Sequence, residues 1–323
     1  MRTRDLVVVV TGASSGIGRA TARAFADQGN ALALAARGDA ALDDVVQECV
    51  GRGGQAIAVP TDVSDSSAVQ ELARRAIQRY GRIDVWVNNA AVSAFGPFQD
   101  IPEEDFRRVL DVNVMGYVHG ARAALPVMRD QGHGVLVNVS SVVGVVTQPY
   151  THAYTMAKFA VRALSGSLRQ ELQLEAASGI HVCTVLPATI DTPIFQHAAN
   201  YTGRAVRAVP PVYPPERVAR TTVNLVRRPR REVAVGTAAH ALLMQSRLTP
   251  GLVERLMAIQ VGRQHFLPRP APDTAGNLFR PALQPVTTHG GWDSGQKIAR
   301  RVVGTAATLL VGTAAAAFRR WRR

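Results

Sequence analysis

One stretch near the N-terminus decides the fold: residues 6–18 read LVVVVTGASSGIG. The branched apolar run at 6–10 is typical of a buried strand, and residues 18–27 carry apolar side chains at helical spacing. A glycine-rich turn between a strand and a helix lets the main chain approach a pyrophosphate and directs helix N-terminal amides toward its negative charge. Such a turn could also be a plain connection. Its position after a strand and before a helix favours the nucleotide-binding interpretation.

The alternation of short apolar runs with longer helical patterns continues to residue 236. Near-continuous apolar strands are typical of a parallel sheet that helices cover on both faces. We therefore expect an α/β protein with a Rossmann-type, doubly wound parallel sheet flanked by helices, followed by a C-terminal helical extension. The seven predicted strands are residues 6–10, 31–35, 56–60, 85–88, 135–139, 181–186 and 232–235.

Composition divides the chain into four parts. We expect a catalytic domain over residues 1–236 and a helical extension over 237–261 that serves as a substrate cap or an interface. Residues 262–297 are rich in proline and glycine, which predicts an irregular linker. Residues 298–323 hold an uncharged, apolar-leaning segment, 302–318, between arginines. Its length lies at the lower limit for spanning a bilayer, so a membrane anchor and a helix packed on the protein stay equally open.

The charge and the cysteines narrow the class of protein. The formal net charge is +13, which could indicate a nucleic-acid partner. Much of the excess lies beyond residue 262, where arginines bracket an apolar segment rather than lining a groove with stacking aromatic residues, so we expect no nucleic-acid partner. The two cysteines, Cys49 and Cys183, lie in different periodic segments and support neither a disulfide framework nor a metal site. With no signal peptide in the first strand, a cytoplasmic location fits best.

The pattern T-G-x-x-x-G-x-G that begins at Thr11 resembles the cofactor motif of the short-chain dehydrogenase/reductase family, and later motifs follow in that family's order to about residue 236. The resemblance implies an oxidoreductase that transfers hydride between a nicotinamide cofactor and a carbonyl or alcohol. Two positions depart from the family pattern, because Ala91 and Ala188 stand where glycine is usual. The cofactor contacts that the resemblance implies are Gly12, Ser14, Ser15, Gly16, Ile17, Gly18, Asp62, Val63, Asn89, Ala90, Tyr154, Lys158, Pro187, Ile190 and Thr192.

The end of the second predicted strand indicates which dinucleotide is bound. NAD-specific family members usually carry an acidic residue there, but in this chain Ala36 is followed by Arg37. A guanidinium suits the 2′-phosphate of NADP, which a carboxylate would repel. Arg37 could instead be a solvated loop residue, but its place beside the missing acid favours phosphate binding. We therefore predict NADP(H) as the cofactor.

Tyr154 and Lys158 are four residues apart in a segment, 153–172, that reads as a helix, so both side chains lie on one face. A phenol transfers protons near neutral pH only if positive charge stabilises the phenolate, and Lys158 and the nicotinamide can supply that charge. Ser141 precedes Tyr154 by the interval that the family uses for its substrate-orienting serine. Asn113 resembles the family's asparagine that kinks its helix and holds a water in a proton relay to the lysine.

The substrate and the partners are the least determined features. Mostly apolar candidate pocket residues indicate a hydrophobic carbonyl or alcohol substrate, and the resemblance implies a homo-oligomer. The alternative is a catalytically silent nucleotide-binding scaffold or sensor at a membrane, which the presence of Ser141, Tyr154 and Lys158 disfavours. The candidate pocket residues are Val92, Phe95, Val142, Val143, Tyr150 and Phe195.

Overall fold

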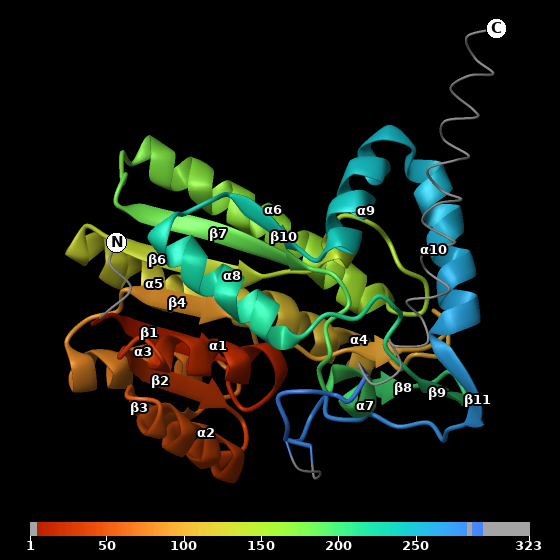
Figure 1. Cartoon of the computed structure of the whole chain (residues 1–323), viewed down its shortest axis with the longest axis horizontal. Helices are drawn as coiled ribbons and strands as arrows, with labels where there is room; N and C mark the ends of the chain where they lie inside the picture. The colour runs from red at the N-terminus through yellow and green to blue at the C-terminus, as the bar shows by residue number, and fades with distance from the viewer. Residues whose placement is uncertain (1–4, 283–285, 293–323) are drawn as a thin grey trace, which may run out of the picture.

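The apolar runs of the sequence form a parallel sheet at the centre of the molecule (Figure 1). The computed structural model describes residues 5–282 and 286–292, and within them the main sheet has seven strands in the order β10–β7–β6–β4–β1–β2–β3. All neighbouring strands in it run parallel, so the predicted doubly wound sheet is confirmed. The strands are β1 (Val7–Thr11), β2 (Ala31–Ala36), β3 (Gln55–Pro60), β4 (Val85–Asn88), β6 (Gly134–Val139), β7 (Ile180–Pro187) and β10 (Glu232–Val235).

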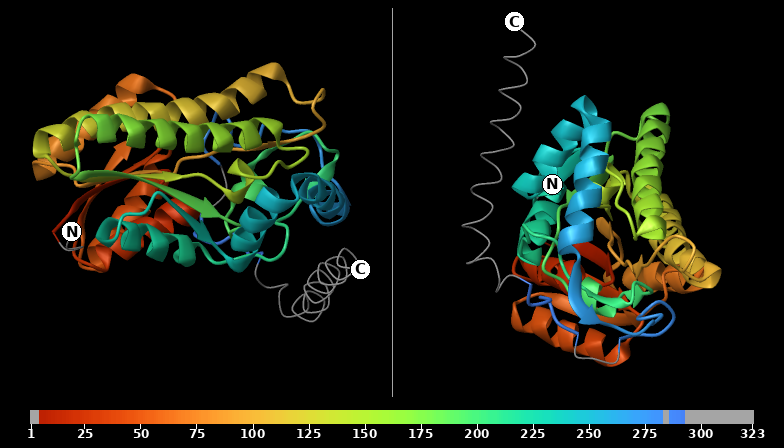
Figure 2. Two further views of the ribbon diagram at one scale, coloured as in Figure 1. Left: turned by 90° about the horizontal axis from the view of Figure 1, so that it is seen from above. Right: turned by 90° about the vertical axis from the view of Figure 1, so that its right-hand side faces the viewer.

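Helices cover both faces of this sheet (Figure 2). One face carries α1 (Gly16–Ala26), α2 (Asp39–Gly51) and α8 (Pro215–Arg227). The other carries α3 (Ser66–Tyr80), α5 (Gly116–Gln131) and α6 (His152–Leu174). The strand β1 lies between β2 and β4 in the sheet, with a layer of helices on each face, so all five of its residues are buried. Burial on both faces explains its unbroken run of branched side chains.

The strand order reverses between β1 and β4, since β2 and β3 continue on one side of β1 and β4, β6 and β7 on the other. In an open α/β sheet, ligands bind at such a switch point, outside the carboxyl ends of the strands. Short elements gather along this edge: β5 (Ala94–Phe95), α4 (Glu103–Leu110), the π-helical turn η1 (Asp111–Met115), the 3-10 turn η2 (Val142–Gly144), α7 (Ile194–His197) and β8 (Ala199–Asn200).

The predicted helical extension consists of α9 (Thr237–Leu248) and α10 (Pro250–Gln264), which stand beside the end of the sheet (Figure 1). The expectation of an irregular chain from residue 262 onward is wrong at its start. There α10 continues to Gln264, and β11 (Phe266–Pro270) pairs antiparallel with β9 (Arg204–Val206). Prolines are compatible with a two-stranded edge pairing of this kind, because only some of its amides donate.

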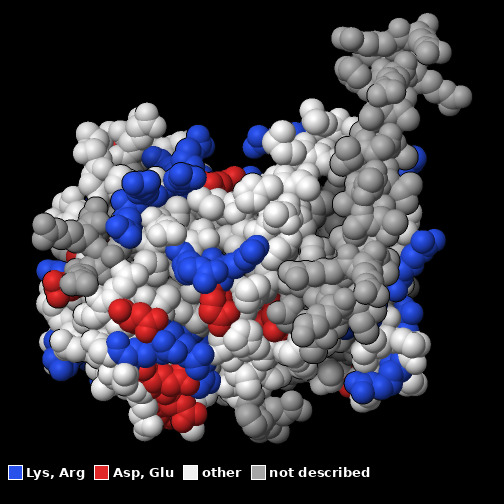
Figure 3. Space-filling model, in the orientation of Figure 1, with Lys and Arg blue, Asp and Glu red and all other residues white. Residues whose placement is uncertain are grey.

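The predicted membrane segment, residues 302–318, lies outside the described part of the chain. Among the described residues, none of the helices is both long and apolar enough to span a bilayer. On the face drawn in Figure 3, basic side chains gather in separate groups, several of them beside acidic side chains.

Candidate active site

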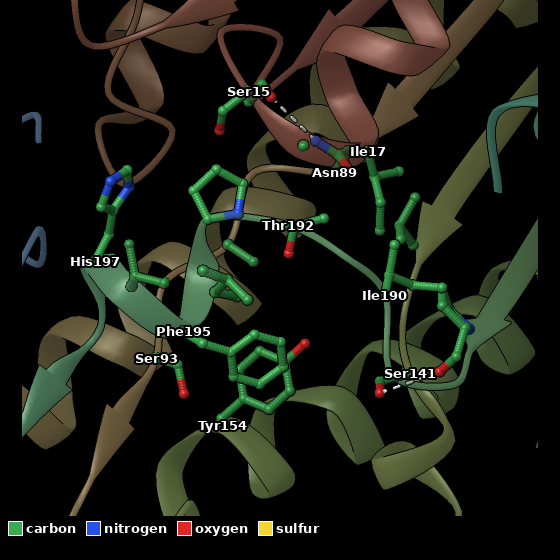
Figure 4. Close-up of a pocket in the computed structure, with 18 of the residues that line it drawn as sticks. Ser15, Ile17, Asn89, Ser93, Ser141, Tyr154, Ile190, Thr192, Phe195 and His197 are labelled. Carbon is green, nitrogen blue, oxygen red and sulfur yellow. Dashed lines mark hydrogen bonds between the residues drawn. The ribbon is translucent and has the colours of Figure 1, made fainter. Parts of the chain in front are cut away.

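A cavity of about 920 Å³ opens at the carboxyl edge of the sheet. Figure 4 shows Ser15 and Asn89 toward one end of the view and Ser141 and Tyr154 toward the other, with Thr192 between them. Most of the predicted cofactor residues meet here. Those that line the cavity are Gly12, Ser14, Ser15, Gly16, Ile17, Arg37, Asp62, Val63, Asn89, Ala90, Tyr154, Lys158, Pro187, Ile190 and Thr192.

The glycine turn brings main chain rather than side chains to the cavity. Gly12 and Gly16 have φ of 64° and 49°, and a Cβ on Gly12 would lie 2.7 Å from the Cα of Ala90. Such close approach and positive φ both require glycine. Asn89 holds the turn, because its Nδ2 donates to the carbonyl oxygens of Thr11 and Gly12 at 2.9 and 3.2 Å. The turn therefore forms a main-chain cradle at the start of α1, a shape that fits a dinucleotide pyrophosphate, and in this structure the Gly16 amide donates to the carbonyl oxygen of Thr287 at 3.1 Å.

Gly18 has a different place from the one predicted, because it lies outside the cavity lining. A Cβ there would lie 2.0 Å from the carbonyl oxygen of Gly12. The third glycine of the motif thus allows α1 to pack closely against the turn.

Arg37 and Asp62 lie at the outer end of the cavity. The guanidinium of Arg37 donates to the carbonyl oxygens of Leu278 and Asn277, at 2.8 and 2.6 Å. Asp62 forms an ion pair with Arg108. Burial by itself would raise the pKa of Asp62, but the bonds from Arg108 and from Ser64 outweigh it and hold that pKa below its usual value. Both predicted contacts of the nucleotide are therefore already fixed by protein partners.

Tyr154 and Lys158 lie in the first two turns of α6, and both side chains line the cavity. The Lys158 Nζ donates to the carbonyl oxygen of Val139 at 2.9 Å and to the Tyr117 hydroxyl at 3.2 Å. Burial lowers the pKa of Lys158 to about 7. Burial likewise raises the pKa of Tyr154 to about 12, and the nearby Ser141 hydroxyl opposes this rise.

Ser141 ends the strand-edge segment after β6 and lines the cavity with Tyr154 (Figure 4). Its Oγ accepts from the amide of Val143 at 3.3 Å and lies 3.5 Å from the carbonyl oxygen of Pro187. The second bond is long, so the hydroxyl can turn toward a substrate oxygen at small cost. The neighbouring Ser140 instead donates to the main-chain oxygen of Lys158 at 2.8 Å.

Asn113 lies outside the cavity lining, in the π-helical turn η1. Its Oδ1 accepts from the Val92 amide at 2.9 Å, and its Nδ2 donates to the Val92 carbonyl oxygen at 2.8 Å. The helix is distorted at Asn113, as the resemblance implied. The side chain, however, is committed to holding Val92, whose side chain lines the cavity.

The apolar part of the cavity is built as predicted except at one residue. Val92, Phe95, Val142, Val143 and Phe195 line it. The prediction for Tyr150 is wrong, because Tyr150 lies outside the lining and packs edge-on against Phe266, with ring centroids 5.2 Å apart. The extension adds apolar lining that sequence reasoning did not assign: Leu242, Met257 and Val261.

Two further residues escaped prediction. Tyr117 is buried beside Lys158, and its hydroxyl donates to the Val139 carbonyl oxygen at 2.8 Å. His265 lines the cavity, and its Nδ1 lies 2.5 Å from the carbonyl oxygen of Arg207. Burial lowers the pKa of His265 to about 4, so the ring is neutral at physiological pH. No motif in the sequence marked either residue, although Tyr117 follows Asn113 by about one helical turn.

Comparison with known proteins finds a matching family model and related sequences. A family model described as short chain dehydrogenase matches residues 6–201. The uncharacterized oxidoreductase YxnA of Bacillus subtilis (strain 168) is 40% identical over 260 residues, which cover 79% of this chain and 72% of the relative. The probable oxidoreductase EphD of Mycobacterium tuberculosis (strain ATCC 25618 / H37Rv) is 36% identical over 275 residues, which cover 80% of this chain but 45% of that longer protein.

Two solved structures resemble the chain over most of its length. One is a short chain dehydrogenase/reductase from Burkholderia phymatum in complex with NAD, with a TM-score of 0.71 and 30% identity, covering 78% of this chain and 96% of that one. The other is an alcohol dehydrogenase from Thermococcus sibiricus complexed with 5-hydroxy-NADP, with a TM-score of 0.63 and 28% identity, covering 72% and 96%. These two relatives hold different dinucleotides.

Proposed function

The chain belongs to the short-chain dehydrogenase family, and we propose that it is an NADP(H)-dependent oxidoreductase that interconverts a hydrophobic carbonyl compound and its alcohol. The observation that carries this proposal is the arrangement of one cavity. Ser141, Tyr154 and Lys158 line its inner part, and the glycine cradle lines the same cavity at the start of α1. The cradle would hold the pyrophosphate of a dinucleotide, and Ser141 and Tyr154 would meet the substrate in the inner part of the same cavity.

The bound nicotinamide supplies the hydride chemistry, and the protein's residues handle the substrate oxygen and its proton. For reduction, the Tyr154 hydroxyl donates its proton to the carbonyl oxygen as negative charge develops there. Ser141 donates a hydrogen bond to the same oxygen and stabilises that charge. Lys158, when protonated, lowers the energy of the phenolate that remains. Oxidation of the alcohol is the reverse, with Tyr154 accepting the proton.

We keep Asn113 in the proposed proton relay with a narrower role. Its side-chain amide bonds to the main chain of Val92, so we assign it to positioning η1 and Val92 beside the relay rather than to holding a water with its side chain. The bonds of Lys158 to Tyr117 and Val139 meanwhile fix the ammonium group in place.

The choice of NADP(H) over NAD(H) rests on Arg37. Its guanidinium lines the cavity beyond the end of β2, at the place where a ribose 2′-phosphate is expected. A guanidinium has five N–H donors, and its bonds to Asn277 and Leu278 use one on each terminal nitrogen. Arg37 can therefore hold those two carbonyl groups and a phosphate at the same time.

A hydrophobic substrate is supported by the lining of the cavity. Valine and phenylalanine side chains surround the region next to Tyr154, and α9 and α10 add Leu242 and Met257 as a cap. Burial of apolar substrate surface against such side chains contributes roughly 25 cal/mol per Å². We also propose a homo-oligomer, on the family resemblance, which light scattering of the full chain would test.

A substrate panel tests the proposed reaction. The purified chain with NADPH is mixed with hydrophobic ketones and aldehydes and, separately, with small hydrophilic sugars and keto acids, and nicotinamide absorbance is followed. We expect turnover in the first set. Turnover of the hydrophilic set alone would overturn the substrate class, and tight nucleotide binding without any turnover would favour the alternative of a silent scaffold or sensor.

A further inference from the structure

After β11 the chain runs back to the carboxyl edge of the sheet (Figure 1). There it contacts residues from the start of the sequence, such as Arg19 and Arg37. We call residues 277–282 and 286–292 the C-terminal strap. Asn277, Pro281, Ala282 and Val286 of the strap line the same cavity as the glycine turn. The strap therefore forms part of the wall of the site, and its contacts fall at three places along that wall.

At the outer end, the strap is anchored by one buried side chain and two arginines. Leu278 is fully buried in the same apolar cluster as Val63 and Val112. Its carbonyl oxygen accepts from Arg37 at 2.8 Å and from Arg108 at 2.9 Å. The charged groups that flank the expected 2′-phosphate position are thus tied to the strap.

At the pyrophosphate cradle, the strap contacts the first turn of α1. The amide of Gly16 donates to the carbonyl oxygen of Thr287 at 3.1 Å. One turn further along the helix, Arg19 donates to the carbonyl oxygen of Val286 at 2.6 Å. These contacts place the strap at the helix end where phosphate groups bind.

Beyond the cradle, the strap is anchored by a buried carboxylate. Oδ1 of Asp191 accepts from the amides of Gly290 and Trp292 at 3.1 and 2.8 Å. The indole of Trp292 donates to the carbonyl oxygen of Thr192 at 3.1 Å and packs edge-on against Phe195. Asp191 lies between Ile190 and Thr192, the residues expected to contact the nicotinamide carboxamide, so the strap follows the whole length of the nucleotide site.

We propose that the C-terminal strap is a working part of the nucleotide site: it positions Arg37 for the 2′-phosphate, and its Thr287 carbonyl oxygen occupies the Gly16 amide of the pyrophosphate cradle, so the strap shifts when the nucleotide enters or leaves. The proposal rests on the proposed function, since it assumes that the cavity binds a nicotinamide dinucleotide. Its basis is the sum of the contacts at the three places. A pyrophosphate reaches the Gly16 amide only after the bond from that amide to Thr287 breaks, so movement of the strap sets the rate of exchange.

The structure offers a way to fix the strap in place. A Cβ built on Gly38 lies 3.6 Å from the Cβ of Pro281, within the range of about 3.5–4.5 Å that disulfides span. The full chain with Gly38→Cys and Pro281→Cys can therefore be cross-linked by oxidation. The native Cys49 and Cys183 are buried, and burial raises their pKa to about 12 and about 11, which keeps them unreactive.

Stopped-flow fluorescence of NADPH measures association and release with the double variant oxidised or reduced. We expect oxidation to slow both rates by about tenfold or more, and reduction by dithiothreitol to restore them. The matched controls are the two single-cysteine variants, whose rates should not respond to oxidation. Equal rates in the oxidised and reduced double variant would overturn the proposal, as would failure of the cross-link to form, measured by mass spectrometry.

A second pair of variants loosens the strap without a cross-link. Asp191→Ala removes the acceptor of the Gly290 and Trp292 amides, whereas Asp191→Asn keeps an acceptor oxygen at that place. We expect faster NADPH release in the first variant and near-native release in the second, and equal release rates in all three proteins would contradict the anchoring role. If the native chain binds neither NADPH nor NADH, the proposed function itself has failed, and the role of the strap falls with it.

Discussion

The Nζ of Lys158 lies 5.3 Å from the ring centroid of Tyr154; Lys158 is buried, and Tyr154 is partly buried at the cavity wall. Removal of water strengthens the interaction between an ammonium group and a phenolate. It also penalises each charge separately, which raises the pKa of Tyr154 to about 12 and lowers that of Lys158 to about 7. The pair is thus arranged so that a charge on one residue favours the opposite charge on the other.

The stability of the nucleotide-free protein should depend on pH through Lys158. Lysine titrates near 10.5 when unfolded and near 7 in this site, so between those pH values the unfolded chain binds more protons. The contribution of Lys158 to the free energy of unfolding therefore rises with pH across that window and is lowest below pH 7. Urea denaturation of the native chain and of Lys158→Met at several pH values measures it. A difference between the two proteins that stays constant from pH 6 to pH 10 would contradict the depressed pKa.

Tyr154→Phe should remove turnover and keep the nucleotide. Loss of the proton donor should lower kcat by roughly 10²- to 10⁴-fold, whereas the ring that remains still fills its place in the cavity. Nicotinamide absorbance gives kcat, and NADPH fluorescence gives the dissociation constant. Tyr80→Phe, at the end of α3, is the control. A large loss of NADPH affinity in Tyr154→Phe would count against its role as acid and base.

Ser141→Ala should lower kcat by roughly 10²- to 10³-fold, as removal of one donor to a developing oxyanion commonly does. Ser140→Ala is the informative comparison, because its hydroxyl bonds to the main chain of Lys158. That variant should lose stability in thermal unfolding while keeping most of its turnover. The reverse ranking of the two variants in kcat would transfer the substrate-orienting role to Ser140.

Arg37→Ala should weaken NADPH binding far more than NADH binding. Hydrogen bonds to charged groups contribute about 1.5–3 kcal/mol, which corresponds to roughly a 10- to 150-fold loss of affinity for the phosphorylated nucleotide. Isothermal titration with both nucleotides checks this, with Arg74→Ala on the exposed surface of α3 as the control. An unchanged ratio of the two affinities would remove Arg37 from the phosphate site.

Glu48 should stabilise the fold near neutral pH. Its carboxylate accepts from Arg19 and Arg23 of α1 and so joins α2 to α1. Bonds from Arg23 and Arg19 lower the pKa of Glu48 to about 2, so its stabilisation is complete above the usual pKa of 4.5 and is lost as pH falls toward 2. Glu48→Gln should lower the free energy of unfolding by about 1–2 kcal/mol at pH 7, with a smaller difference in acid. Equal stabilities at pH 7 would show that the arginines find other partners.

The sheet could be predicted because its signal is local. The predicted strands at 85–88 and 232–235 coincide with β4 and β10, and the other five overlap their strands, since a buried parallel strand must be a short, nearly continuous apolar run. The strand β11 was missed because Pro268 and Pro270 made its segment resemble a linker. Its regularity comes from pairing with β9, about sixty residues away along the chain, which periodicity within the segment does not reveal.

In the site, too, the contacts within one helix could be predicted from the sequence, whereas the contacts between distant segments could not. Tyr154 and Lys158 could be placed together because four residues of one helix bring two side chains to one face. The contact of Lys158 with Tyr117 joins residues 41 positions apart, and that of Arg37 with Leu278 joins residues 241 apart. The motif alone could not show that Gly18 allows close packing against Gly12, because that contact depends on how the turn folds.

Binding of NADPH in this cavity and its use on a carbonyl substrate can be tested together. The most direct measurement is titration of the purified full chain with NADPH and with NADH, followed by nicotinamide absorbance after addition of hydrophobic ketones and aldehydes. We expect tighter binding of NADPH than of NADH, and oxidation of NADPH only when a carbonyl compound is present. Absence of binding by either nucleotide would contradict it.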